Sequence, residues 1–464
     1  MNTRLAIDIG ASNGRLVLGC LDDGRLITEE IYRFKNTVSR TDGHQCWDID
    51  ALYRNILKGL KRCAELGKIP ASLGVDTWGV DFVLLDAADQ MLGGAVTHRD
   101  ARTYGIEDAV SKRIPDAELY ARTGIQKRRF NTIYQIAAVQ SQTPGLLKRA
   151  EKLMMIPDYL HFLLTGVQMS EYTNASTTGL LNVREKTWDI GLLDHLGFPR
   201  RLFGELHAPG TTVGRLSAEV QKEVGFDCDV VMPPTHDTAS AFLAVPTACE
   251  DTVFLSCGTW NVIGVETGRP ITTEASRAAN FSNEGGFGYR YRFLKNILGL
   301  SLLERVRLDV QVNYPGMAKI ARTSSFSGSI DASADGFLNP SVSLAATIRN
   351  ACAEAGLPVP EAKNDFLRCL YNSLARVFAK SADTLETLTG RKYSRIHIVG
   401  PGSRDTFLNE LTAHAAGLPV YAGPADVTVL GSIAAQMIAA GELDSVEAAR
   451  TAIRAGAEIK EYEP

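Results

Sequence analysis

Aspartates and glycines at the ends of predicted strands are the residues of this sequence best suited to chemistry on a phosphate. Asp8 ends an apolar segment, and Gly10 and Gly14 frame a short polar loop directly after it. Glycines let backbone N–H groups approach phosphate oxygens, and an aspartate at a strand end can hold Mg²⁺, usually through water. An ordinary hairpin turn has the same composition. The loop has neither the Gly-Lys-Ser/Thr of a Walker loop nor the glycine spacing of a dinucleotide fingerprint.

A second loop of similar sequence lies a little over half the chain later. Gly258 and Thr259 follow another strand-like segment and stand where Gly10 and Ala11 stand in the first loop. This separation is too long for a solenoid repeat and indicates a duplication into two similar domains. Two such loops on either side of a cleft would hold one polyphosphate, which favours the functional interpretation of both.

A third polar segment presents His236 and Asp237 at the start of a predicted helix. Phosphoryl transfer depends on positioning and electrostatics more than on covalent chemistry, so one aligned carboxylate can accept the proton of an attacking hydroxyl. Asp237 is the candidate for that role. An aspartate at a helix start is also a frequent N-cap, and a single histidine such as His236 is more often structural than catalytic.

Two more segments have the composition of a ligand site. Residues 74–81 bring small and polar residues into a pair of predicted strands, where Trp78 suits either sugar stacking or core packing. The turn at Gly400, Pro401 and Gly402 lies between a predicted strand and a predicted helix, a geometry that suits adenosine or phosphate. As an isolated motif this turn is weak.

The elements that must position these residues alternate between strand and helix, which predicts an α/β fold. Expected strands are Leu5–Ile9, Leu16–Cys20, Leu26–Tyr32, Ser72–Val75, Val80–Leu85, Thr252–Ser256, Val262–Glu266, Arg395–Val399 and Val420–Ala422. Expected helices are Ile49–Leu66, Thr238–Leu243, Asn364–Leu388, Asp405–Ala416 and Val429–Ala440. The repeated strand–loop–strand unit predicts two domains, residues 1–244 and 245–464.

Composition excludes several classes of protein. The 464 residues are 45% hydrophobic and 22% charged, a globular balance too long for one core. A formal net charge of −4 gives no sign of a nucleic-acid partner, and no apolar run reaches the roughly 18 residues of a membrane span. The eight cysteines are scattered without a Cys-x-x-Cys pair, which is typical of reduced thiols. We therefore expect a cytoplasmic protein that binds small molecules.

Taken together, these segments resemble the FGGY carbohydrate kinases, members of the actin-like and hexokinase-like ATPase fold. The resemblance runs from about residue 5 to about residue 440. Its most specific stretches are residues 8–15, 76–82, 156–159, 171–178, 236–240, 280–286 and 294–296. The fold that it implies is a pair of ribonuclease-H-like α/β domains flanking a nucleotide–sugar cleft.

The resemblance also implies a role for individual residues. Asp237 becomes the general base on a sugar hydroxyl, and Asp8 lies near Mg²⁺. The implied ATP contacts are Ala11, Ser12, Asn13, Gly14, Arg15, Thr259, Glu304 and Gly402. The implied sugar contacts are Gly79, His236, Asp237, Thr238 and Asn296. The chain departs from the family on the nucleotide side, where Pro401, Asp405 and Glu304 stand in place of the usual Gly, Asn and Gln.

The activity implied by the resemblance is transfer of the γ-phosphoryl group of ATP to the 1-hydroxyl of L-rhamnulose, a step of L-rhamnose catabolism. Kinases of other ketoses, such as L-fuculose or L-xylulose, stay open because sugar identity depends on a few pocket contacts. An inactive sugar sensor or a nucleotide-dependent switch would be a different class of protein. The presence of both Asp8 and Asp237 favours an enzyme. The sequence makes no prediction of oligomeric state.

Overall fold

The computed structural model describes residues 2–313, 316–332, 337 and 343–464, and its chain forms two compact units. The first unit comprises Met1–Pro246, Glu266–Phe293 and Thr428–Gly456. The second comprises Thr247–Val265, Leu294–Val427 and Ala457–Pro464. The first change of unit falls after Pro246, and the chain returns to the first unit twice afterwards. The predicted division of the domains between residues 244 and 245 stays a prediction.

The first unit contains most of the secondary structure. Its strands are β1 (Arg4–Ile9), β2 (Asn13–Asp22), β3 (Arg25–Lys35), β4 (Val38–Thr41), β5 (His44–Trp47), β6 (Ser72–Thr77), β7 (Phe82–Leu85), β8 (Ala95–Val96), β9 (Lys152–Met155), β10 (Ser170–Glu171), β11 (Leu181–Asn182), β12 (Thr187–Trp188), β13 (Leu206–His207), β14 (Thr212–Arg215), β15 (Asp229–Val231) and β18 (Ser282–Gly285). Its helices are α1 (Ile49–Glu65), α2 (Ile106–Ser111), α3 (Asp116–Thr123), α4 (Thr132–Gln142), α5 (Pro144–Arg149), α6 (Ile156–Thr165), α7 (Tyr172–Ala175), α8 (Ile190–Leu196), α9 (Ala218–Val224), α10 (Asp237–Leu243), α11 (Glu274–Ala278), α18 (Val446–Gly456) and nearly all of α17 (Val427–Ala439).

The second unit is smaller. Its strands are β16 (Thr252–Cys257), β20 (Arg395–Val399), β21 (Val420–Ala422), β22 (Lys460–Tyr462) and most of β17 (Trp260–Thr267) and β19 (Tyr291–Leu298). Its helices are α12 (Leu300–Asp309), α13 (Met317–Arg322), α14 (Leu344–Glu354), α15 (Lys363–Thr389) and α16 (Thr406–Ala416). None of the helices built from the described residues of the chain combines the length and hydropathy that a bilayer span requires.

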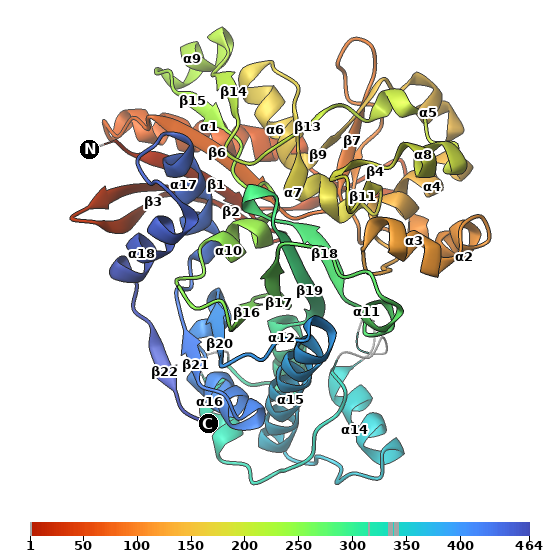
Figure 1. The fold of residues 1–464 in the computed structure, drawn as a ribbon, viewed down its shortest axis with the longest axis vertical. Coiled ribbons are helices and arrows are strands. Elements are labelled where there is room, and N and C mark those ends of the chain that lie inside the picture. The colour runs from red at the N-terminus through yellow and green to blue at the C-terminus, as the bar shows by residue number, and fades with distance from the viewer. Residues whose placement is uncertain (1, 314–315, 333–336, 338–342) are drawn as a thin grey trace. The chain divides into compact units, whose positions relative to one another are not determined.

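A six-stranded sheet forms the centre of the first unit, with its strands in the order β14-β15-β6-β1-β2-β3 (Figure 1). The central strand β1 is antiparallel to β2 and parallel to β6, and it is buried along nearly its whole length. A strand covered on both faces requires this nearly continuous apolar sequence. The register sets Asp8 beside Asp76, so two acidic residues are adjacent at the carboxyl ends of parallel strands.

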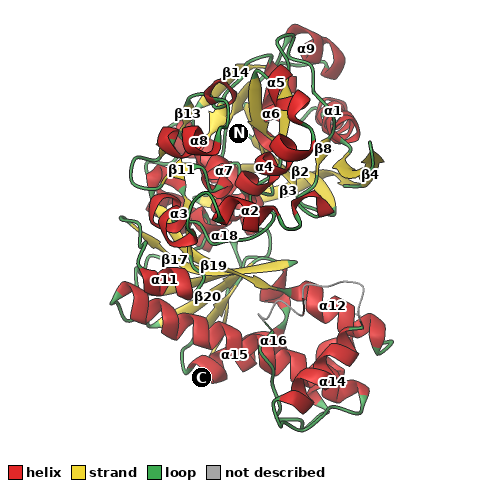
Figure 2. Ribbon diagram, turned by 90° about the vertical axis from the view of Figure 1, so that its right-hand side faces the viewer, coloured by secondary structure: helices red, strands yellow, loops and turns green. Residues whose placement is uncertain are grey.

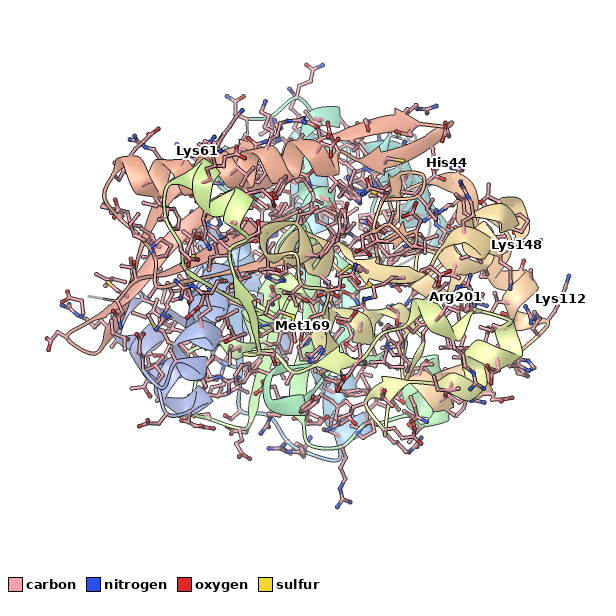
Figure 3. The ribbon with its side chains drawn as sticks, turned by 90° about the horizontal axis from the view of Figure 1, so that it is seen from above. His44, Lys61, Lys112, Lys148, Met169 and Arg201 are labelled. Carbon is pink, nitrogen blue, oxygen red and sulfur yellow. The ribbon has the colours of Figure 1, made fainter. Side chains whose placement is uncertain are left out.

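Helix α1 covers one face of this sheet. It begins after Asp48, whose carboxylate caps the helix by accepting a hydrogen bond from the N–H of Ala51 at 2.9 Å. Its apolar residues fall at helical spacing and are buried, as the sequence predicts. On the surface, Lys61 of α1 forms an ion pair with Glu223 of α9 at 3.0 Å (Figure 3).

Helices α17 and α18, from the end of the chain, also belong to the first unit and lie beside its N-terminal strands (Figure 1). Gln436 of α17 donates a hydrogen bond to the carbonyl of Leu5 at 3.1 Å and accepts one from Ser72 at 2.6 Å. A Cβ on Gly19 would lie 2.6 Å from the Ile433 side chain, so the missing side chain permits close packing of α17 on β2. The sheet is therefore covered by segments from both ends of the sequence.

The sheet of the second unit repeats the core of the first. Strand β16 is antiparallel to β17 and parallel to β20, as β1 is to β2 and β6. The order β19-β17-β16-β20-β21-β22 extends this pattern. Figure 2 shows α15 and α16 along one side of these strands. The topology matches the duplication that the two glycine loops predict.

The secondary structure follows the sequence-based expectations closely. Every expected strand and helix is present with ends shifted by a few residues. One boundary was placed wrongly: the strand expected from Val80 begins at Phe82, because Val80 has a φ of 68° and cannot continue a strand.

Candidate active site

The first glycine loop is a tight hairpin between β1 and β2. Gly10 donates its N–H to the carbonyl of Asn13 at 2.9 Å. Asn36 closes the loop from the side, with its backbone N–H on the carbonyl of Ser12 and its side-chain amide on the carbonyl of Gly10, both at 3.0 Å. Ser12 and Asn13 are exposed and Ala11 is half-buried. The backbone and Asn36 therefore set the loop's shape, and its polar side chains reach the surface.

Three carboxylates lie near the carboxyl ends of β1 and β6 and the start of α10. Asp8 accepts a hydrogen bond from Nε of Arg15 at 3.0 Å. Asp76 is fully buried, and neither of its carboxylate oxygens forms a well-shaped hydrogen bond to the described residues. Burial raises the pKa of Asp76 well above its usual range, and the carboxylates of Asp8 and Asp237 raise it further.

Asp237 is the first residue of α10, so it is not the N-cap of that helix. The cap position belongs to His236, and Asp237 instead accepts the N–H of Thr238 at 2.6 Å. Loss of water around the carboxyl group, followed by repulsion from Asp8, raises the pKa of Asp237 to about 7. The side chain is still 31% exposed. A partly accessible carboxylate with this pKa is suited to proton transfer near neutral pH.

The turn after β6 contains a backbone conformation that the sequence does not reveal. Val80 has a φ of 68°, which is rare for a β-branched residue. Thr177 holds this turn by accepting the N–H of Val80 at 3.0 Å, and a Cβ on Gly79 would lie 3.0 Å from the Thr177 side chain. The carbonyl of Val80 accepts the hydroxyl of Thr132 at 2.7 Å. Strain of this kind is concentrated at ligand sites, so the turn around Gly79 is a candidate sugar contact.

Asp81 connects the aromatic residues beside this turn. Its Oδ2 accepts hydrogen bonds from the indoles of Trp47 at 2.7 Å and Trp78 at 2.9 Å, and it lies 2.8 Å from Nδ1 of His98. The rings of Trp47 and Trp78 are 4.1 Å apart, and Trp78 is 7% exposed. Trp78 therefore packs in the core, one of the two roles its sequence position allows. Despite its burial, hydrogen bonding and the charge of His98 lower the pKa of Asp81.

The second glycine loop is also a tight hairpin, one residue shorter than the first, between β16 and β17 of the second unit. The N–H of Gly258 lies 3.2 Å from both the carbonyl of Trp260 and Oδ1 of Asn261. Thr259 is exposed. The chain passes behind the loop at Gly299, where a Cβ would lie 2.5 Å from the carbonyl oxygen of Gly258. Gly299 is thus a requirement of this loop that sequence reasoning missed.

The remaining predicted nucleotide residues also lie in the second unit. Gly402 is buried in the 3₁₀ turn after β20, against Cys257. Asp405 caps α16 by accepting the N–H groups of Phe407 and Leu408, and it accepts the hydroxyl of Tyr371 at 2.7 Å. The aspartate at this position therefore has a structural partner on each oxygen.

Two more predicted site residues lie on β19 and α12 of this unit. Glu304 of α12 accepts a hydrogen bond from Nε of Arg307 at 2.7 Å, and this ion pair lowers the pKa of Glu304. Asn296 is half-buried on β19. Of the predicted site residues, the first unit brings together Asp8, Arg15, Asp237, His236 and Thr238, and the second holds Thr259, Asn296, Glu304 and Gly402.

The acidic cluster is the part of the first unit that fits a divalent cation. No three His, Cys, Asp or Glu side chains among the described residues form a ready-made metal cage. Asp76 nevertheless keeps two buried oxygens outside any well-shaped hydrogen bond, next to the charges of Asp8 and Asp237. Carboxylate oxygens with room for water are the ligands that Mg²⁺ prefers. The residues present therefore fit a hydrated cation held at Asp8.

Comparison with known proteins gives consistent matches along the whole chain. Residues 3–244 match the family model for the N-terminal domain of the FGGY family of carbohydrate kinases, and residues 253–440 match that for its C-terminal domain. The rhamnulokinase of Halalkalibacterium halodurans is 42% identical over 464 residues, covering 100% of this chain and 99% of that protein. The rhamnulokinase of Klebsiella pneumoniae subsp. pneumoniae is 41% identical over 466 residues, covering 99% and 94%.

Solved structures match the fold at much lower sequence identity. A ligand-bound xylulose kinase from Lactobacillus acidophilus has a TM-score of 0.81 at 17% identity, covering 100% of this chain and 94% of that one. Plasmodium falciparum glycerol kinase with ADP has a TM-score of 0.79 at 14% identity, with the same coverage. These matches confirm the predicted two-domain α/β fold of the actin-like and hexokinase-like type.

Proposed function

Because this chain belongs to the FGGY family of carbohydrate kinases, we propose that it transfers the γ-phosphoryl group of ATP to the 1-hydroxyl of L-rhamnulose. The products are L-rhamnulose 1-phosphate and ADP. The observation that carries the chemistry is Asp237, a carboxylate with a pKa of about 7 at the start of α10. The choice of sugar follows the rhamnulokinases, which are about 41–42% identical over nearly the whole chain.

Asp237 acts as the general base in this proposal. Its ionised carboxylate accepts the proton of the sugar hydroxyl as the hydroxyl oxygen attacks the γ-phosphorus and the bond to the β-phosphate oxygen breaks. Above pH 7 the carboxylate is ionised in most molecules, while its raised pKa keeps it a stronger base than an exposed aspartate. One positioned base suffices because the rest of the barrier is lowered by alignment and charge neutralisation.

Members of this family use ATP and a divalent cation, which we take to be Mg²⁺. Asp8 would hold the cation through water, and the cation would neutralise phosphate charge when bound. The loop residues Ala11, Ser12, Asn13, Gly14 and Arg15 and the second-unit residues Thr259, Glu304 and Gly402 are the proposed ATP contacts. Exposed Ser12, Asn13 and Thr259 support this assignment. The Glu304–Arg307 ion pair means that Glu304 must contact the nucleotide while holding Arg307.

The proposed sugar contacts are Gly79, His236, Asp237, Thr238 and Asn296. His236 and Thr238 flank the base and are both half-buried. Burial and the neighbouring guanidinium of Arg292 lower the pKa of His236 well below its usual range, so the ring is neutral near pH 7. A neutral imidazole supplies one donor and one acceptor, which suits a sugar hydroxyl. We place the reaction in the cytoplasm, in keeping with eight cysteines that form no disulfide in the described chain.

The test is ADP release by the purified protein with Mg-ATP and a panel of sugars. The panel contains L-rhamnulose, L-fuculose, L-xylulose, D-xylulose, L-ribulose and glycerol. We expect the highest kcat/KM on L-rhamnulose, with product analysis locating the phosphate on the 1-oxygen. Asp237→Asn, prepared in parallel, reports any contaminating kinase.

Each other result has a defined meaning. A higher kcat/KM on another ketose would retain the kinase and reject L-rhamnulose as the substrate. No turnover on any sugar, with a cooperative thermal transition proving that the protein is folded, would reject the enzyme in favour of a sugar sensor or a switch.

A further inference from the structure

Arg292 is a buried cation that the reaction itself does not require. It lies on β19 between the buried apolar residues Tyr291 and Phe293, and its side chain has no exposed surface. A guanidinium cannot lose its charge inside a protein, so its position must be stabilised by specific partners. Those partners include His236 and Thr238, the residues on both sides of Asp237.

The guanidinium of Arg292 contacts two proposed sugar ligands at once. Nη1 donates to Oγ1 of Thr238 and Nη2 donates to Nδ1 of His236, both at 3.1 Å. Nε donates to the carbonyl of Gly285 at 2.8 Å, and Glu284 balances the charge with its Oε2 at 3.1 Å from Nη2. The planar fork of arginine is therefore fixed on one side by β18 and holds two side chains on the other.

These contacts favour one of the two neutral tautomers of His236. Arginine has only donors, so Nδ1 must be the acceptor of the bond from Nη2. The neutral ring consequently carries its proton on Nε2, which lies 2.8 Å from Oγ1 of Thr238. The opposite tautomer would direct an N–H at the guanidinium of Arg292 at 3.1 Å, and its one compensating acceptor among these partners is Oε2 of Glu284, at the longer distance of 3.4 Å from Nδ1.

The same contacts define what Thr238 offers to a ligand. Its Oγ1 receives the Nη1 proton of Arg292 and the Nε2 proton of His236. Both lone pairs of the hydroxyl are then occupied, and its own hydrogen is directed away from these two residues. Thr238 can therefore act toward a sugar as a hydrogen-bond donor.

We propose that Arg292 is a positioning residue for the sugar, which fixes His236 as the Nε2–H tautomer and Thr238 as a hydrogen-bond donor on either side of Asp237. This inference rests on the proposed function, because it takes the sugar as the ligand of His236 and Thr238. Arg292 itself does not touch the reacting atoms in this proposal. Its contribution is to fix the hydrogen-bonding pattern before the sugar arrives, so that binding does not have to reorient these groups.

The kinetic experiment compares Arg292→Lys with Arg450→Lys. Arg450 is the control because it also pairs with a glutamate, the part-buried Glu266 at 2.9 Å, and donates to the carbonyls of Phe242 and Leu243 at the other end of α10. Lysine keeps the charge but cannot bond two side chains in one plane. We expect Arg292→Lys to raise KM for the sugar about 10- to 100-fold and to change KM for ATP less than twofold.

A second experiment reads the tautomer without any turnover. Protein with ¹⁵N-labelled histidine gives ring-nitrogen shifts that separate the two neutral tautomers, and the signal of His236 is identified by its loss in His236→Gln. We expect Nε2–H in the wild type. We expect a mixture of tautomers in Arg292→Met combined with Glu284→Gln, which removes both charges of the pair together and so avoids leaving one of them buried alone.

The outcomes separate this inference from the proposed function. Wild-type protein that phosphorylates no sugar fails the proposed function, whatever the tautomer of His236. An active wild type with His236 as Nδ1–H overturns the positioning role. So does a sugar KM that rises equally in Arg292→Lys and Arg450→Lys, since the effect would then be a general loss of packing. If Arg292→Lys does not fold, the wild-type ring shifts decide the question.

Discussion

The two glycine hairpins join strands in the same arrangement but differ in the residues beside them. In each unit a strand enters the loop, an antiparallel strand leaves it, and a parallel strand lies on the other side. Two positions before the first glycine, the first unit has Asp8, paired in register with Asp76. The equivalent pair in the second unit is Ser256 and Val399. The duplicated arrangement therefore has two glycine hairpins, and the strand pair leading to the first has two acids where the second has Ser256 and Val399.

If the proposed roles of the two hairpins hold, the first unit supplies the groups for proton transfer and the second supplies nucleotide contacts. In the first unit, burial and then the charge of Asp8 raise the pKa of both Asp76 and Asp237. In the second hairpin, the feature that we single out is steric. A side chain on Gly299 would have no space beside the carbonyl oxygen of Gly258. Changes in the first unit should thus affect turnover and pH dependence, and changes in the second should affect nucleotide affinity.

The largest expected effect is the loss of turnover in Asp237→Asn. Without an ionised carboxylate, no group at this position accepts the hydroxyl proton, and we expect kcat to fall roughly 10²- to 10⁴-fold. Asp229→Asn is the control, because Asp229 is an aspartate at a strand end of the same sheet, and its side chain forms a surface pair with Arg215 at 3.5 Å. Initial-rate measurement of ADP release checks this. A variant that keeps more than a tenth of wild-type kcat would remove Asp237 from the role of base.

The next effect is on the pH profile. Since Asp237 must be ionised and its pKa is about 7, kcat/KM for the sugar should fall about tenfold for each pH unit below 7. The carboxylate of Asp8 raises this pKa, so Asp8→Asn should move the acid limb to lower pH even though the rate itself drops. A wild-type profile that stays flat down to pH 5.5 would contradict both statements.

A smaller effect is expected from Gly299→Ala in the second unit. The added Cβ would lie 2.5 Å from the carbonyl oxygen of Gly258, so the loop must move, and we expect KM for ATP to rise about tenfold. KM for the sugar should stay within twofold. Gly268→Ala is the control, because its Cβ would meet open space. An unchanged KM for ATP would show that this loop does not set nucleotide affinity.

The smallest expected effect is on thermal stability. Asp237→Asn, which lowers kcat, should raise Tm. The folded-state pKa of Asp237 lies above its usual 3.8, so the native state is destabilised as the pH rises from about 4 to 7 and the carboxyl ionises. Asp237→Asn removes this penalty. Without ligands at pH 8, we expect its Tm to exceed that of the wild type by about 2–4 °C. The gain should shrink as the pH falls from 7 toward 4, and a gain independent of pH would point to another cause.

The sequence predicts the elements well, because apolar periodicity and glycine turns are local signals. It marks Asp8 and Asp237 by their positions at a strand end and a helix start. It cannot show that Asp76 lies in register with Asp8, since parallel strands are joined by a long crossover and their pairing is a tertiary property. The φ of Val80 is equally hidden, because a valine usually indicates a strand.

Arg292 lies between the features that the sequence predicts and those that it hides. An arginine between Tyr291 and Phe293 in an apolar strand is an unusual signal, and it could have been singled out from the sequence as a buried charge. What the sequence lacks is the identity of its partners. Glu284, His236 and Thr238 are brought to it from two other segments of the chain, and only the fold connects them.

The position of α17 on the first sheet has a consequence for synthesis on the ribosome. Gln436 bonds to Leu5 across nearly the whole sequence, so this contact cannot form until almost the entire polypeptide has emerged. A nascent chain ending near Pro246 contains all six strands of that sheet but leaves uncovered the face on which Gly19 and Gly74 receive α17. Contacts this distant in sequence are slow to form, and exposed apolar strands associate with other chains in the meantime. The face of the first sheet that α17 covers is therefore the last part of that sheet to be completed during synthesis.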